Sequence, residues 1–159
     1  MKIYVECKPD EVLLRKLGIR PQSIRHAGDK GRVCRNLQKD RGSMGIVDED
    51  PGSPQPSYME RLRLLQDQHG IRVLEDPPCQ SRLIVLCPRL EGWILDAARQ
   101  AGIEVERRFG LPDDETRFHK IINLNIDKFE ELIEALLQRQ SPRLRALRAI
   151  VGFRRGRRR

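Results

Sequence analysis

The chain has 159 residues, of which 38% are hydrophobic and 34% are charged, so it can bury one modest core beneath a strongly charged surface. Aromatic residues make up only 4%, which argues against a stacking platform for single-stranded nucleic acid. The formal net charge is +8, and residues 141–159 hold eight arginines and no acid. Removing these eight from the 31 basic residues leaves 23, which balance the 23 acidic residues elsewhere. The basic segment is therefore expected to contact a polyanion, with a merely solubilising tail as the alternative.

The four cysteines form no C-x-x-C pair, so neither a zinc site nor a disulfide framework of a secreted protein is indicated. The N-terminus lacks a charged segment followed by an apolar one, and no apolar run approaches the roughly 18 residues of a membrane span. We therefore expect a cytoplasmic protein with no membrane partner.

The first half of the chain alternates between short apolar runs and segments with apolar residues at helical spacing. The apolar runs predict strands at residues 2–6, 23–26, 44–48, 71–75 and 83–87. The helical spacing predicts helices at residues 9–17, 32–38 and 58–69. Strands that alternate with helices, some of them apolar throughout, favour an α/β fold with a parallel sheet covered on both faces.

The second half is predicted to be helical. Helices are expected at residues 89–101, 126–138 and 143–151, with a loop at 109–117. We expect three parts: an α/β core at residues 1–88, a helical extension packed on it at 89–151, and a flexible basic tail at 152–159.

Acidic residues follow two of the predicted strands. Glu6 ends the first strand and Asp48 the third, with Asp50 just beyond it. Because parallel strands end at the same edge of a sheet, these carboxylates are expected to converge, and their repulsion would be relieved by a hard cation such as Mg²⁺ or Mn²⁺. On extended backbone Asp48 and Asp50 would face the same side and Glu49 the other. The alternative is a solvated turn, since Asp-Glu-Asp-Pro-Gly is good turn chemistry.

The segments "IYVECKPDE", "HAGDKGRV" and "GIVDED" resemble, in this order, the Toprim domain shared by topoisomerases, bacterial primases, recombination proteins and OLD-type nucleases. The resemblance covers about residues 1–88 and implies a Toprim-like parallel sheet of about four to five strands, followed here by the C-terminal helical extension. The family pattern has a Glu after the first strand and an Asp-x-Asp after the third, which match Glu6, Asp48 and Asp50. Cys7 stands where the family usually has Gly, and the Pro-Gly after the Asp-x-Asp favours the nuclease branch.

By this resemblance Glu6, Asp48 and Asp50 would hold one or two Mg²⁺ or Mn²⁺ ions. Asp10 matches an acidic position of the nuclease branch, although a first-turn acid that favours the helix dipole explains it equally well. Glu91 resembles a helical Glu of OLD-type nucleases that could be a further ligand, and it could also be an ordinary first-turn acid. Lys30 matches a basic position in a turn and would contact phosphate or serve only the turn.

The expected activity is metal-dependent phosphoryl transfer on nucleic acid, most plausibly nuclease cleavage, with Glu6, Asp48, Asp50 and Lys30 as catalytic residues. The residues expected to bind DNA or RNA are Lys30, Arg32, Arg154, Arg155, Arg157, Arg158 and Arg159. The chain has no G-x-x-x-x-G-K-[ST] loop, whereas OLD-type nucleases carry an ATPase on the same chain, so a separately encoded ATPase is an expected partner. The alternative is a non-catalytic nucleic-acid-binding or scaffold subunit of a repair or defence complex. The role of His119, as a packed or surface side chain or as an acid or base, is left open.

Overall fold

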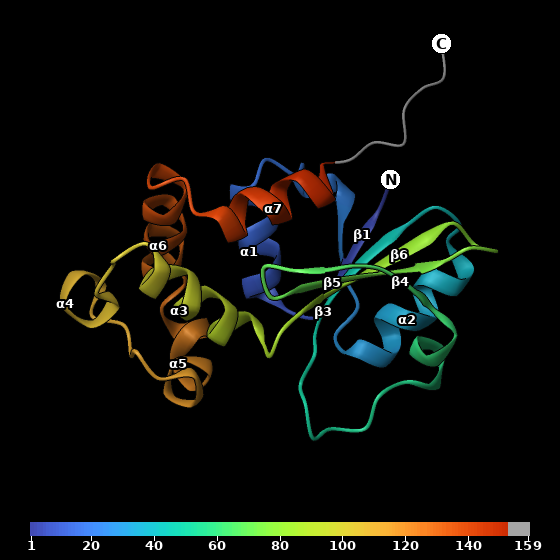
Figure 1. The fold of residues 1–159 in the computed structure, drawn as a ribbon, viewed down its shortest axis with the longest axis horizontal. Helices are drawn as coiled ribbons and strands as arrows, with labels where there is room; N and C mark the ends of the chain where they lie inside the picture. Colours follow the sequence, from blue (N-terminus) through green and yellow to red (C-terminus); the bar gives the residue numbers. More distant parts are fainter. Residues whose placement is uncertain (153–159) are drawn as a thin grey trace, which may run out of the picture.

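The computed structural model describes residues 1–152 and has an α/β fold built on one six-stranded sheet (Figure 1). The strands are β1 Ile3–Val5, β2 Ile24–His26, β3 Met44–Asp48, β4 Arg63–Gln68, β5 Ile71–Asp76 and β6 Ser81–Leu86, in the sheet order β2-β1-β3-β6-β5-β4. The helices are α1 Lys8–Lys16, α2 Lys30–Lys39, α3 Leu90–Gln100, α4 Val105–Phe109, α5 Glu115–Ile121, α6 Ile126–Gln138 and α7 Pro142–Val151. Three short 3-10 turns lie at Pro21–Ser23, Ser57–Arg61 and Ile122–Leu124.

Four strands of the sheet are parallel. β1 pairs with both β2 and β3, and β3 pairs with β6, so these four strands end at one carboxyl edge. β5, which was expected to be parallel as well, is antiparallel to β6 and to β4. Only residues 77–80 join β5 to β6, and a connection this short allows a hairpin but no crossover to a parallel strand.

The prediction of a helix at residues 58–69 is wrong. The chain there forms the 3-10 turn Ser57–Arg61 and then β4. His69 and Gly70, with φ of 58° and 67°, form a two-residue connection that suits a right-twisted hairpin and directs β4 back along β5. The short apolar pattern of this segment fits either element, and the pairing partner decides which one forms.

The predicted loop at residues 109–117 is shorter in the structure, where it comprises residues 110–114. α4 ends at Phe109, and α5 begins at Glu115, where the Asp114 carboxylate caps the helix by accepting a hydrogen bond from the amide of Arg117 at 2.8 Å.

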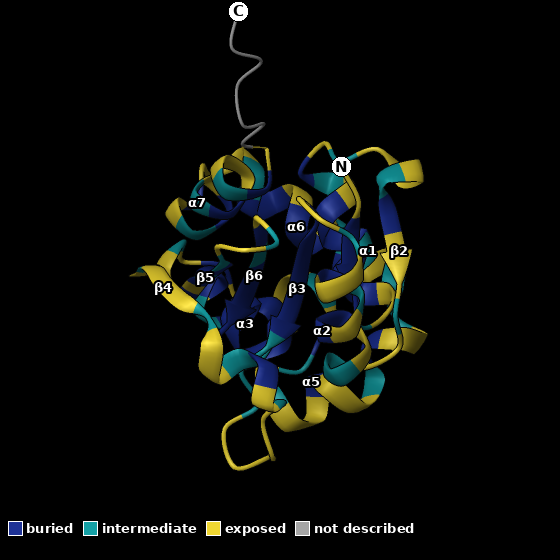
Figure 2. Cartoon of the chain, turned by 90° about the vertical axis from the view of Figure 1, so that its right-hand side faces the viewer, coloured by how far each residue is buried: buried dark blue, intermediate teal, exposed yellow. Residues whose placement is uncertain are grey.

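Helices cover both faces of the sheet, as expected, but unequally (Figures 1 and 2). α2 packs on one face, where its buried Val33 and Leu37 join Val47 and Val85 of the strands in the smaller core cluster. α1, α3, α6 and α7 contribute to the larger cluster on the other face.

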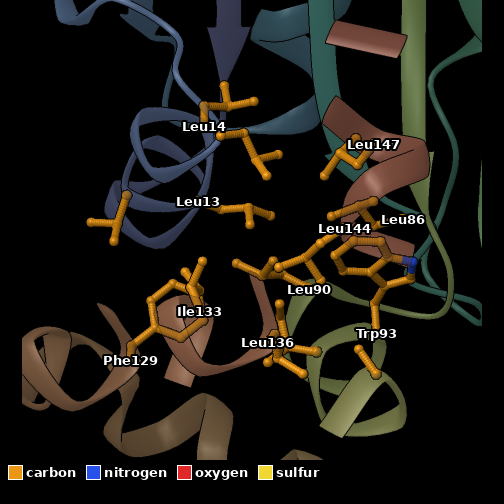
Figure 3. Packing of buried hydrophobic residues seen from close by; sticks show 14 of the residues in the cluster. Leu13, Leu14, Leu86, Leu90, Trp93, Phe129, Ile133, Leu136, Leu144 and Leu147 are labelled. Carbon is orange, nitrogen blue, oxygen red and sulfur yellow. The ribbon is translucent and has the colours of Figure 1, made fainter. Parts of the chain in front are cut away.

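The C-terminal helices share this larger core with the sheet. Leu13 and Leu14 of α1 are buried in the same cluster as Phe129 and Ile133 of α6 (Figure 3). The Trp93 indole of α3 is buried and donates a hydrogen bond to the carbonyl of His69 at 2.8 Å, which joins α3 to the β4–β5 hairpin. Sheet and helices therefore depend on one another for burial. None of the helices within residues 1–152 combines the length and the apolar character needed to cross a membrane.

Candidate carboxylate site

Two backbone-to-carboxylate hydrogen bonds join three elements at the carboxyl edge of the sheet. Glu6, just after β1, accepts a hydrogen bond through Oε2 from the amide of Asp48 at 2.9 Å. Asp48, the last residue of β3, accepts one through Oδ1 from the amide of Leu90 at 2.8 Å. Leu90 is the first residue of α3, so its amide is one of those that a helix leaves unpaired at its start. The predicted convergence of Glu6 and Asp48 is therefore present in the structure.

Asp10 adds a third carboxylate and is buried, with 3% of its surface exposed. Its Oδ2 accepts hydrogen bonds from the amide of Cys7 at 3.2 Å and from the Cys7 thiol at 3.3 Å, which closes the start of α1. Burial first, and then the charge of Asp48, raise the pKa of Asp10 well above its ordinary value. Asp10 thus caps its helix and also belongs electrostatically to the cluster.

Glu91, in the first turn of α3, is the fourth acid and is 4% exposed. His119 of α5 lies with Nδ1 3.0 Å from Glu91 Oε1, and this histidine side chain is 54% exposed. Because a carboxylate only accepts hydrogen bonds, the contact assigns the hydrogen to Nδ1. The other oxygen of Glu91, Oε2, is buried and has no hydrogen-bond partner among residues 1–152. A buried carboxylate oxygen without a donor is costly, and a cation is the usual remedy.

The four carboxylates lie close enough to influence one another. Burial is the main cause that raises the pKa of Asp48 to about 7, and the charges of Glu6 and then Glu91 add to it. Burial also raises the pKa of Glu6, against the lowering effects of the Asp48 amide and of Lys30. Burial, and to a lesser extent their mutual repulsion, therefore disfavours the charged forms of these acids.

Asp50 lies differently from the prediction. β3 ends at Asp48, and Asp50 has a left-handed backbone with φ of 48°, so the alternation that would place Asp48 and Asp50 on one side does not apply. Its carboxylate accepts a hydrogen bond from the Ser53 hydroxyl and forms an ion pair with Arg89 at 2.8 Å. The hydroxyl, followed by Arg89, lowers the pKa of Asp50. The Glu49 carboxylate forms an ion pair with Arg72 of β5 at 3.1 Å.

Lys30 is the predicted cation within residues 1–152 whose charge acts on the cluster. Its Nζ donates to the carbonyl of Glu49 at 2.9 Å and to Gln55 Oε1 at 2.9 Å, and its charge lowers the pKa of both Glu6 and Asp48. Arg32 is exposed and forms a 3.6 Å ion pair with Asp29. The tail residues Arg154, Arg155, Arg157, Arg158 and Arg159 lie outside the described residues.

Two further residues of this region were not assigned from the sequence. The sequence assigns Arg89 only as the first residue of a helix, whereas in the structure its guanidinium forms an ion pair with the Asp50 carboxylate. His119 lies 28 positions from Glu91, and no spacing rule links residues so far apart. The only available signal was their residue types, which suit acid–base or ligand chemistry.

The donor set is composed of hard oxygen ligands, which suit Mg²⁺ or Mn²⁺. Glu6, Asp48 and Glu91 each use one carboxylate oxygen in the hydrogen bonds described above, and the other oxygen accepts none from the part of the chain that is described. Within residues 1–152, however, no three Cys, His, Asp or Glu side chains are arranged so that they could hold a metal ion. The acids are thus gathered but not set in a ligand geometry.

Comparison of the chain with protein-family models, with curated proteins and with solved structures found no match.

Proposed function

We propose that the protein is a nuclease that catalyses Mg²⁺- or Mn²⁺-dependent phosphoryl transfer on nucleic acid. The observation that carries the proposal is the cluster of four acids, of which Asp10 and Glu91 are buried and Glu6 and Asp48 half-buried; Glu91 Oε2 lacks a partner among residues 1–152, and the pKa of Asp48 is raised to about 7. Such a cluster is unfavourable in the free protein and favourable around a divalent cation. The likeness of the Glu6, Asp48 and Asp50 pattern to the Toprim domain supports the same chemistry.

In this proposal Glu6, Asp48 and Glu91 would hold the metal through the oxygens that accept no hydrogen bond, after their side chains turn toward a common point. A bound divalent ion would activate water and stabilise the charge that develops on the phosphate. Asp10 holds the start of α1 through Cys7 and adds negative charge to the cluster. Asp50 holds Arg89 at the rim of the cluster.

Lys30 would contact the phosphate of the substrate. It already lies close enough to lower the pKa of Glu6 and Asp48, and its partners Glu49 and Gln55 offer only neutral oxygens. A phosphate oxygen is a stronger acceptor than either of them for an ammonium group.

A second candidate is a non-catalytic nucleic-acid-binding or scaffold subunit. It is favoured by one observation, that no three potential ligands within residues 1–152 are arranged to hold a metal ion. In this case the acids would contribute to the structure alone.

A cleavage assay distinguishes the nuclease from the non-catalytic subunit. Labelled single- and double-stranded DNA and RNA are incubated with the protein in Mg²⁺, in Mn²⁺ and in EDTA, beside Asp48→Ala and Glu91→Gln. We expect cleavage only with a divalent metal, and a loss of about 100-fold or more in both variants, because each removes a charge from the metal site. Glu49→Gln, whose carboxylate pairs with Arg72 instead, is the matched control and should cleave like the unsubstituted protein.

Metal-dependent cleavage that persists in Asp48→Ala would contradict the proposed site. Binding of nucleic acid without cleavage, unchanged in Asp48→Ala, would support the scaffold subunit instead.

A further inference from the structure

One face of α2 carries a row of basic side chains, which we call the α2 ridge: Arg32, Arg35 and Lys39. All three are exposed and follow one another at i, i+3 and i+7, while Val33, Cys34 and Leu37 between them are buried against the sheet. Residues three, four and seven apart lie on the same side of a helix, so the ridge is continuous. The helix itself, Lys30–Lys39, contains no acidic residue.

The charges of the α2 ridge are largely uncompensated. The side chains of Arg35 and Lys39 have no hydrogen bond or ion pair with any described residue, and the Arg32 guanidinium has only the exposed 3.6 Å pair with Asp29. In α7, Arg143 lies within reach of Asp96 and the carbonyl of Trp93, whereas the side chains of Arg145 and Arg148, like those of Arg35 and Lys39, have no hydrogen bond or ion pair within residues 1–152. The chain as a whole outside residues 141–159 is neutral, so a helix with only basic charged residues is a local departure from its surroundings.

The first turn of α2 lies near the candidate site. Lys30, the first residue of α2, influences the pKa of Glu6 and Asp48, and Arg32 follows two residues later. From Arg32 to Lys39 the helix rises by about 10 Å, which equals roughly three steps of a nucleic-acid strand at about 3.4 Å each. Lys30 shares its side of α2 with the buried Val33 and Leu37, so a strand whose phosphate lies at Lys30 would pass over the first turn of the helix to reach the ridge.

The other basic element, α7, lies elsewhere. It packs on the opposite face of the sheet from α2 (Figure 1). Its last residue Val151, together with Arg148, lines a cavity that Met1 and Ile3 also line, next to the start of β1. That is the amino edge of the parallel strands, whereas the carboxylates gather at the carboxyl edge.

We propose that the α2 ridge binds the sugar–phosphate backbone of the nucleic acid that reaches the carboxylate site, and that α7 does not. This inference rests on the proposed function, because it takes the ligand to be nucleic acid. Contacts of this kind carry no sequence preference and weaken steeply with salt.

The test is a binding measurement in EDTA, which separates binding from any cleavage. Fluorescence anisotropy with labelled double- and single-stranded DNA and RNA compares the unsubstituted protein with the double variant Arg35→Glu, Lys39→Glu. The matched control is Arg145→Glu, Arg148→Glu, which makes the same charge change at two exposed positions of α7. Urea unfolding of each variant verifies that it is folded.

We expect the α2 variant to bind at least about 10-fold more weakly at 100 mM salt, and the slope of log affinity against log salt to fall in magnitude by about two. The α7 variant should lose less than about 3-fold. Equal losses in the two variants, or no loss in the α2 variant, would overturn the assignment, as would a failure of the unsubstituted protein to bind. Binding through the ridge by a protein that never cleaves would sustain this inference while the nuclease proposal fails.

Discussion

Glu91 is the acid of the cluster that has a buried carboxylate oxygen without a hydrogen-bond partner among residues 1–152. It lies in the first turn of α3 with one oxygen held by His119 Nδ1 and the other unpartnered within residues 1–152. His119 itself is half-exposed and comes from α5, so its ring spans from the buried acid to the surface. Ligands of a metal are commonly oriented by such a donor, which fixes the direction of the carboxylate.

If His119 orients Glu91 toward a bound metal, substitutions of His119 should weaken metal binding to different degrees. His119→Asn can offer an amide N–H close to where Nδ1 lies, whereas His119→Gln places its amide nearer to Nε2 and His119→Ala offers no donor. We expect His119→Ala and His119→Gln to bind Mn²⁺ about 10-fold or more weakly, and His119→Asn to stay within a few-fold of the unsubstituted protein. Isothermal titration with Mn²⁺ measures this. Equal affinities in all three variants would show that the histidine does not orient Glu91.

At the scale of elements, the position of the candidate site depends on how closely α2 approaches the sheet. Gly45 of β3 makes this approach possible, because a Cβ built there would lie 2.6 Å from Val33 Cγ1 and 3.3 Å from Leu37 Cδ1. Gly45 therefore sets the height of α2 above β3, and with it the distance of Lys30 from the carboxylates.

Gly45→Ala should accordingly be destabilising. The added methyl group forces α2 outward or Val33 off its rotamer, so we expect the free energy of unfolding to fall by about 1–3 kcal/mol. Gly31→Ala on α2 is the matched control, since its Cβ would meet no atom closer than 3.4 Å, and helix propensity favours alanine by up to about 1 kcal/mol. Urea unfolding monitored by circular dichroism measures both. A Gly45→Ala variant as stable as the control would contradict this account of the packing.

At the scale of the whole molecule, the acid cluster exists only in the folded state. Glu6, Asp10, Asp48 and Glu91 come from three regions of the chain that unfolding separates. The raised pKa of Asp48, about 7 against an ordinary 3.8, means that the folded protein holds a proton there which the unfolded chain has released. Between these two pH values the folded state binds more protons, so stability falls as pH rises.

The contribution of Asp48 to stability in EDTA should therefore decrease as the pH is raised from about 4 to about 7 and then level off. Asp48→Asn removes this contribution while its amide oxygen can still accept the hydrogen bond from Leu90. We expect this variant to match the unsubstituted protein near pH 4 and to exceed it in the free energy of unfolding by roughly 1–3 kcal/mol at pH 8. Urea unfolding across this pH range is the measurement. An Asn variant that is no more stable at pH 8 would show that the Asp48 carboxylate is not strained by its surroundings.

The sequence by itself determined the alternation of strands and helices in the first half, the amphipathic α6, and the placement of Glu6 and Asp48 at strand ends. These features follow from local periodicity, and the meeting of Glu6 and Asp48 follows from the parallel pairing that such alternation favours. The burial of Asp10 could not be read locally, since a first-turn acid is compatible with solvent as well as with a cap.

Only the tertiary structure decided the remaining features. Residues 63–68 form β4 because β5 offers them a partner, although their pattern alone also fits a helix. The Asp50 carboxylate pairs with Arg89 because the chain turns directly after β3, although its charge still raises the pKa of Glu6. Glu91 and His119 meet because α5 packs on α3. Each depends on contacts between residues far apart in the chain, and no local spacing encodes which distant partner a side chain will find.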